Sequence, residues 1–129
     1  MDKVIGLGRM GCAVAEELSA HPEYRIYKID AQTSERVSLS LGVFPSMDEY
    51  ESRIDQDEIA IYLRSIKDED DVLLIVEGGD PVSGATLKVL ECIKNSRINV
   101  LYICPEREMI SQTSKRDDKI AFNIFQEYA

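Results

Sequence analysis

The hydrophobic residues of this chain fall into short runs, separated by polar stretches in which most glycines and prolines gather. Apolar residues predict strands at 3–7, 24–29, 72–76 and 98–103. The run at 72–76 is continuous, as in parallel strands that are buried on both faces, and 98–103 is predicted to be another buried strand. Val37, Leu39 and Leu41 alternate with polar residues and predict another short strand before a turn at 42–45.

Between these runs, apolar residues recur at spacings of three and four, which predicts helices at 10–20, 46–68, 83–95 and 106–129. The first helix has Met10, Val14 and Leu18 on its expected core face. Ser46 and Glu49 have the spacing of a capping box, and the stretch that follows them is either one long helix or two helices joined near Asp55. The last helix ends on apolar residues without a cap, so we expect the chain to be a fragment of a longer protein.

The alternation of strands and helices predicts an α/β fold, a Rossmann-like open sheet that is mainly parallel and has helices on both faces. With 129 residues, of which 44% are hydrophobic, residues 1–129 are expected to form a single domain of the nucleotide-binding type. In such sheets ligands bind beyond the carboxyl ends of the strands.

Glycines follow two of the predicted strands. Gly6, Gly8 and Gly11 have the GxGxxG spacing between the first strand and the first helix, and Asp30 closes the second strand about twenty residues later. Gly78, Gly79 and Gly84 follow the strand at 72–76 and precede a helix. A strand, a glycine turn and a helix N-terminus provide free backbone amides for an anion, so two such turns at one sheet edge predict a shared phosphate ligand.

The net charge of −9 argues against a nucleic-acid or anionic-membrane partner, because both need clustered Lys and Arg. Phosphate would therefore be held by backbone amides. Cys12, Cys92 and Cys104 are widely spaced, which favours reduced thiols and a cytoplasmic protein over disulfides or a zinc site. No run is long enough for a membrane span, and no catalytic residue or metal ligand is predicted.

The sequence from Ile5 to Gly11 resembles the N-terminus of NAD(P)-dependent hydroxyacid and phosphogluconate dehydrogenases, and Asp30 stands where their ribose-binding acid falls. This resemblance covers only about the first thirty residues. It implies an NAD(P)-binding module of an oxidoreductase, which is our first alternative. The second alternative is a degenerate Rossmann-like domain that binds no nucleotide and serves as a protein-interaction surface.

The second glycine stretch, Gly78 to Ala85, resembles the GGGTG(S/T)G-Ala signature loop of the tubulin/FtsZ superfamily. The chain differs from that signature sequence at Asp80, Pro81 and Val82. The run Asn99 to Pro105 also resembles the strand and proline that precede the ribose loop of the family, and Gly6 to Cys12 fits its first phosphate loop, so the similarity spans nearly the whole chain.

This second resemblance implies the N-terminal GTP-binding domain of a filament-forming protein. The expected ligand is GTP or GDP, accompanied by Mg²⁺, and the expected partner is a second copy of the protein. In this family the water-activating acids come from a later loop, presented by the next subunit, so this stretch alone is not expected to hydrolyse GTP. The residues expected at the nucleotide are Gly6, Gly8, Arg9, Met10, Gly11, Cys12, Asp30, Gly78, Gly79, Asp80, Ser83 and Gly84.

Overall fold

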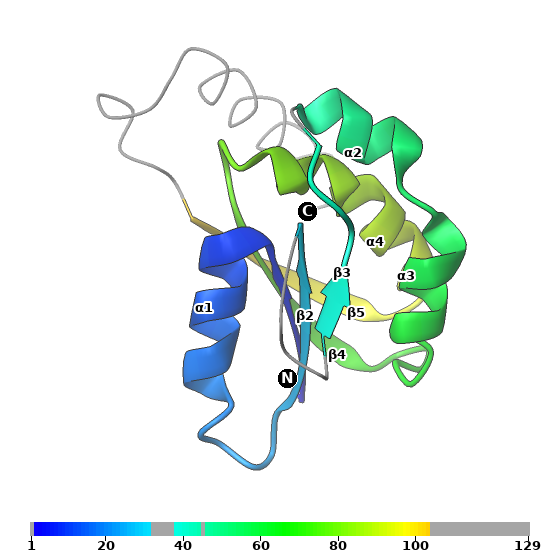
Figure 1. The fold of residues 1–129 in the computed structure, drawn as a ribbon. Helices are drawn as coiled ribbons and strands as arrows, with labels where there is room; N and C mark the ends of the chain where they lie inside the picture. The colour runs from blue at the N-terminus through cyan, green and yellow to red at the C-terminus, as the bar shows by residue number, and fades with distance from the viewer. Residues whose placement is uncertain (1, 32–37, 45, 104–129) are drawn as a thin grey trace.

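The computed structural model describes residues 2–31, 38–44 and 46–103, which form a sheet with helices on both faces (Figure 1). Five strands lie in the order β3-β2-β1-β4-β5, and each neighbouring pair is parallel. Their bounds are β1 Lys3–Leu7, β2 Arg25–Asp30, β3 Ser38–Ser40, β4 Asp71–Glu77 and β5 Arg97–Ile103. The predicted Rossmann-like α/β fold is confirmed, and the sheet is wholly parallel in the described residues.

The helices are α1 Gly8–Leu18, α2 Met47–Arg53, α3 Gln56–Tyr62 and α4 Thr86–Cys92, with a 3₁₀ turn, η1, at Pro81–Ala85. Helix α1 lies on one face of the sheet, and α2, α3 and α4 lie on the other (Figure 1). Successive strand residues point to opposite faces. Val4 and Ile75 thus pack with Ala15 of α1, whereas Ile5 and Leu74 belong to the larger core beneath the other helices.

The predicted helical stretch at 46–68 consists of two helices. The Ser46 hydroxyl accepts a hydrogen bond from the Glu49 amide at 3.3 Å, which confirms the predicted cap. Ile54 then has extended backbone angles, and the Asp55 carboxylate accepts from the Asp57 amide at 2.9 Å to begin α3. The break near Asp55 is therefore a chain turn with its own cap.

Helix α1 contacts the sheet along a line of small residues. Gly11 and Ala15 are buried, whereas Val14 and Leu18 of the predicted core face are half-buried and pack at the margin of the smaller core. A side chain at Gly11 would collide with the Ile75 carbonyl oxygen of β4. The helix lies too close to the sheet for large residues beneath its axis. The helix itself was predicted correctly, but the face that it buries is not the predicted face of Met10, Val14 and Leu18.

Strand β5 was predicted to be a buried strand, and this prediction is wrong. It pairs with β4 and ends the sheet of the described residues. Arg97, Asn99 and Leu101 alternate as exposed residues, and Leu101 is 45% exposed. An apolar run does not distinguish a central strand from one at the sheet margin. The predicted helix at 106–129 lies outside the described residues.

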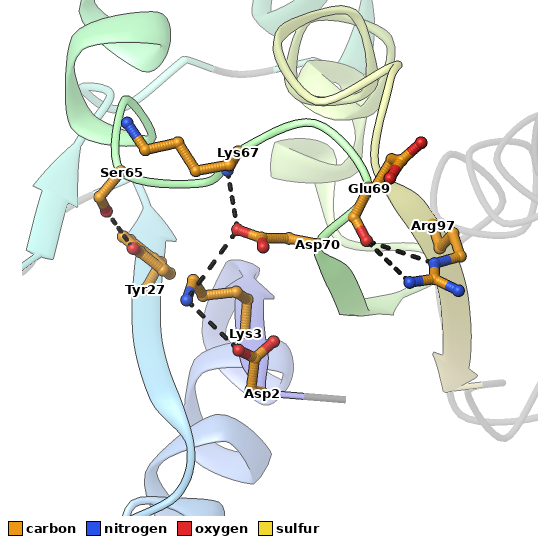
Figure 2. A network of polar contacts seen from close by, with 8 residues as sticks. All are labelled: Asp2, Lys3, Tyr27, Ser65, Lys67, Glu69, Asp70 and Arg97. Atoms are coloured by element: carbon orange, nitrogen blue, oxygen red, sulfur yellow. Dashed lines mark hydrogen bonds and ion pairs between the residues drawn. The ribbon is translucent and has the colours of Figure 1, made fainter.

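The acidic stretch before β4 forms an ordered turn at the amino ends of the strands (Figure 2). The Asp70 carboxylate accepts from the Lys67 amide at 2.7 Å and lies 4.0 Å from the Lys3 ammonium. Glu69 has a φ of 69°, and its carbonyl accepts two hydrogen bonds from Arg97, at 3.1 and 3.2 Å. The acidic residues thus serve to hold the chain as it enters β4.

Candidate ligand site at the carboxyl edge of the sheet

The two glycine turns lie side by side, opposite the acidic turn. They follow β1 and β4, which are neighbours in the sheet, with Leu7 paired to Val76. From β1 the chain goes to β2 on one side, and from β4 it goes to β5 on the other. The turns therefore meet at the point where the strand order reverses, where ligands of open α/β sheets usually bind.

The three glycines of the first turn have different structural tasks. Gly8 has a φ of 82°, a left-handed conformation that glycine adopts without strain, and it lets the chain pass directly from β1 into α1. A Cβ at Gly6 would collide with the Gly11 carbonyl, and one at Gly11 would collide with the Ile75 carbonyl. Gly6 and Gly11 thus permit close packing of the helix on the sheet, and Gly8 forms the turn.

Asp80 connects the two turns. One carboxylate oxygen accepts from the Arg9 amide in the first turn of α1 at 3.2 Å, and the other accepts from the Val82 amide in η1 at 3.0 Å. Leu7, the residue before α1, provides no side-chain cap. One carboxylate therefore caps two helices, and it supplies to α1 the acceptor that its own N-terminus lacks.

This arrangement depends on the missing side chain of Gly8. A Cβ built on Gly8 would lie 2.7 Å from the Asp80 carboxylate oxygen. In dinucleotide-binding folds the middle glycine of the fingerprint lets a ligand phosphate approach the backbone. Here the group that approaches the backbone at Gly8 is a carboxylate of the same chain.

The backbone of the second turn is largely engaged within the fold. The Gly78 amide donates to the Ile103 carbonyl at 3.1 Å, and the Ser83 amide donates to the Asp80 carbonyl at 2.9 Å. Gly79 has a φ of 87°, which reverses the chain after β4. Pro81 begins η1 and has no amide hydrogen to offer. A ligand that bound to the Gly78, Val82 or Ser83 amide would have to replace an existing hydrogen bond.

Two predicted site residues of the second turn lie inside the protein. Ser83 is 1% exposed, and its hydroxyl has no hydrogen-bond partner among the described residues. A Cβ at Gly84 would collide with the Met47 carbonyl at the start of α2. Gly84 thus lets α2 pack on η1, and the contact of both residues with a ligand stays a prediction.

The other predicted residues of the first turn differ in their access to solvent. Arg9 is exposed, and Met10 is half-buried. The Cys12 thiol donates to the carbonyls of Gly6 at 3.4 Å and Ile29 at 3.5 Å, beneath the turn and between β1 and β2. Cys12 therefore supports the backbone of the turn.

Further carboxyl groups surround Asp80. Burial, and secondly the Asp80 carboxylate, raises the pKa of Glu77 at the end of β4. Burial also raises the pKa of Asp30 at the end of β2; the Ala31 amide and Arg9 act in the opposite direction. Asp30 was predicted from its spacing. Glu77 was missed, although a charged residue that closes an apolar strand is a signal for this edge.

Three other features of the described part of the chain concern metal, membrane and pocket sites. Its His, Cys, Asp and Glu residues form no group of three that could hold a metal ion. None of its helices is long and apolar enough to cross a membrane. A hollow of about 130 Å³ lies at the opposite sheet edge, near the end of α4, and is smaller than the roughly 300 Å³ or more of typical ligand pockets.

The fold and the paired turns define a Rossmann-like α/β domain with two glycine turns at its switch point. Its fold is similar to that of part of TubZ, a tubulin/FtsZ-family protein. Similarity to TubZ of Clostridium botulinum phage c-st, with its C-terminal tail truncated, has a TM-score of 0.71 at 12% identity over 94% of this chain and 46% of that one. A second structure of this TubZ gives a TM-score of 0.68 at 13% identity, over 94% and 44% of the two chains.

The chain thus spans less than half the length of these TubZ structures. No protein-family model and no curated protein matches the sequence. The likeness is therefore one of fold, and it agrees with the resemblance of the second glycine stretch.

Proposed function

We propose that this chain is a GTP- and GDP-binding domain of a tubulin/FtsZ-like protein that associates with further copies of itself in the cytoplasm. The observation that carries the proposal is the meeting of two glycine turns after neighbouring parallel strands. A single ligand with several phosphates is long enough to contact both turns. The TubZ-like fold, together with the resemblance of Gly78 to Ala85 to the tubulin/FtsZ signature loop, favours a guanine nucleotide over a dinucleotide.

In this proposal the phosphates lie over Gly8 to Gly11 and over Gly78 and Gly79. Asp30, Glu77 and Asp80 make this edge acidic, and among the described residues Arg9 is the cation that lowers the pKa of Asp30 and Glu77. A phosphate therefore needs a counter-charge, and Mg²⁺ bound with the nucleotide would supply it. For this stretch alone we propose binding without turnover.

The test is calorimetric titration of the 129-residue chain with GTP, GDP and NADH in the presence of Mg²⁺. We expect weak heats of binding with GTP and GDP and none with NADH. Binding of NADH without any response to GTP would refute the proposal and favour the dinucleotide alternative. In that case Asp30→Arg should shift preference towards NADP, because a cation there favours the 2′-phosphate.

A second candidate function is favoured by the hydrogen bonds of Asp80. Its carboxylate engages the Arg9 and Val82 amides, which are donors that a phosphate would use. A domain in which that engagement is permanent would bind no nucleotide and would act as an interaction surface. Absence of any heat with millimolar GTP, GDP and NADH would support this candidate.

A further inference from the structure

We infer that Asp80 is a built-in competitor for phosphate, whose carboxylate holds the anion position between the two glycine turns and sets the affinity for the nucleotide. The inference rests on the proposed function for its ligand. The hydrogen bonds that carry it belong to the described structure.

The first argument is geometric. A phosphate at a strand–glycine–helix turn binds to amides in the first turn of the helix, beside a glycine that lets it approach. The Asp80 carboxylate has both properties, since it accepts from the Arg9 amide at 3.2 Å and lies where a Cβ of Gly8 would be only 2.7 Å away. A phosphate and this carboxylate cannot bind these groups together.

The second argument is that hydrogen bonds within the second glycine turn hold the Asp80 carboxylate in place. Its other oxygen accepts from the Val82 amide at 3.0 Å, and the Asp80 carbonyl accepts from the Ser83 amide at 2.9 Å. Pro81 restricts the backbone after Asp80, and Gly79, with its φ of 87°, lets the chain reverse before it. Asp80 is thus held within an ordered turn. Its side chain therefore loses little further conformational entropy when its carboxylate accepts from the Arg9 amide.

The third argument is electrostatic. Asp80 acts on both Asp30 and Glu77 in the direction that disfavours their ionised forms. The same carboxylate would repel a phosphate that approached along this edge, and the neighbouring acids would add to the effect. Asp80 therefore opposes phosphate in two ways, by occupying its donors and by its charge.

The experiment compares the wild-type chain with Asp80→Asn and Asp80→Gly. Asparagine keeps an oxygen that can accept one of the two hydrogen bonds, whereas glycine restores the residue that the tubulin/FtsZ loop has at this position. Asp55→Asn is the matched control, because Asp55 is also a helix-capping carboxylate but caps α3 within its own segment. Each chain is titrated with inorganic pyrophosphate and with GTP, and its thermal unfolding is recorded with and without these ligands.

We expect both Asp80 variants to bind pyrophosphate and GTP about tenfold to a hundredfold more tightly than the wild type, since one like charge next to the phosphate is removed. Asp55→Asn should match the wild type. Pyrophosphate should raise the unfolding temperature of Asp80→Gly and leave that of the wild type nearly unchanged.

The outcomes separate the two proposals. Equal binding of GTP by wild type and both variants would overturn the role of Asp80 and keep the proposed function. Tighter pyrophosphate binding by the variants, without any response to GTP, would support the role of Asp80 and refute the guanine nucleotide. Weaker binding by Asp80→Asn, seen only with Mg²⁺, would assign the carboxylate to the cation and overturn the inference.

Discussion

Replacement of Asp80 by alanine tests the most unusual feature of the structure, the carboxylate that caps two helices. The change removes the acceptor of the Arg9 amide at the start of α1 and the acceptor of the Val82 amide at the start of η1. Loss of one N-cap costs about 0.5–2 kcal/mol, typically about 1 kcal/mol. If each cap contributes the typical value, removal of both should lower the free energy of unfolding by at most about 2 kcal/mol.

Part of this loss is offset. Asp80 disfavours the ionised forms of Asp30 and Glu77, so its removal relieves that repulsion. We therefore expect Asp80→Ala to lower the free energy of unfolding by about 1–2 kcal/mol. For a chain of 129 residues this corresponds to a fall of roughly 4–8 °C in the unfolding temperature.

The assay is urea and thermal unfolding followed by circular dichroism, with Asp55→Ala as a single-cap control. In the described residues Asp55 caps a single helix, α3, by accepting from the Asp57 amide, so its replacement should cost about 1 kcal/mol. Asp80→Asn should fall between Asp80→Ala and the wild type. If Asp80→Ala matched the wild type while Asp55→Ala lost stability, the double cap would contribute nothing and the reasoning would be refuted.

Further predictions concern the surroundings of the turns. Because burial raises the pKa of Asp30 above its ordinary value of 3.8, the folded state binds this proton more tightly, and the resulting stability is lost as pH rises through the folded pKa. Asp30→Asn should thus be more stable than the wild type at pH 7, by an amount that shrinks as urea unfolding is repeated towards pH 4. Gly84→Ala should destabilise the chain by about 1–3 kcal/mol in thermal unfolding, because its methyl group would meet the Met47 carbonyl. Ser83→Ala should be neutral or slightly stabilising in the same assay, because the buried Ser83 hydroxyl has no hydrogen-bond partner in the described part of the chain. A loss above about 1 kcal/mol would show that this hydroxyl is satisfied.

The order of the elements and the edge that carries the glycine turns could be predicted from the chain. Apolar runs followed by Gly6–Gly11 and Gly78–Gly84 are local signals, and a parallel α/β sheet brings the ends of such strands to one edge. Asp80 was also recognisable as a charge at the mouth of a predicted anion site. These features depend on neighbours in sequence or on the general rules of the fold.

What could not be predicted depends on contacts between distant segments. The partner of Asp80 is an amide 71 positions away, and only the pairing of β1 with β4 brings it near. The burial of Ser83 follows from the packing of α2 on Gly84, which composition does not reveal. The exposure of Leu101 follows from the position of β5 at the sheet margin.

The distance in sequence between Arg9 and Asp80 has a consequence for the order of folding. Helix α1 can form from local contacts, but its first turn receives its cap only after β4 has paired with β1. The cap is thus a late contact that closes a long loop, and late contacts act mainly on the unfolding rate. The carboxylate between the turns would then retard the opening of the completed sheet and leave the speed of its assembly nearly unchanged.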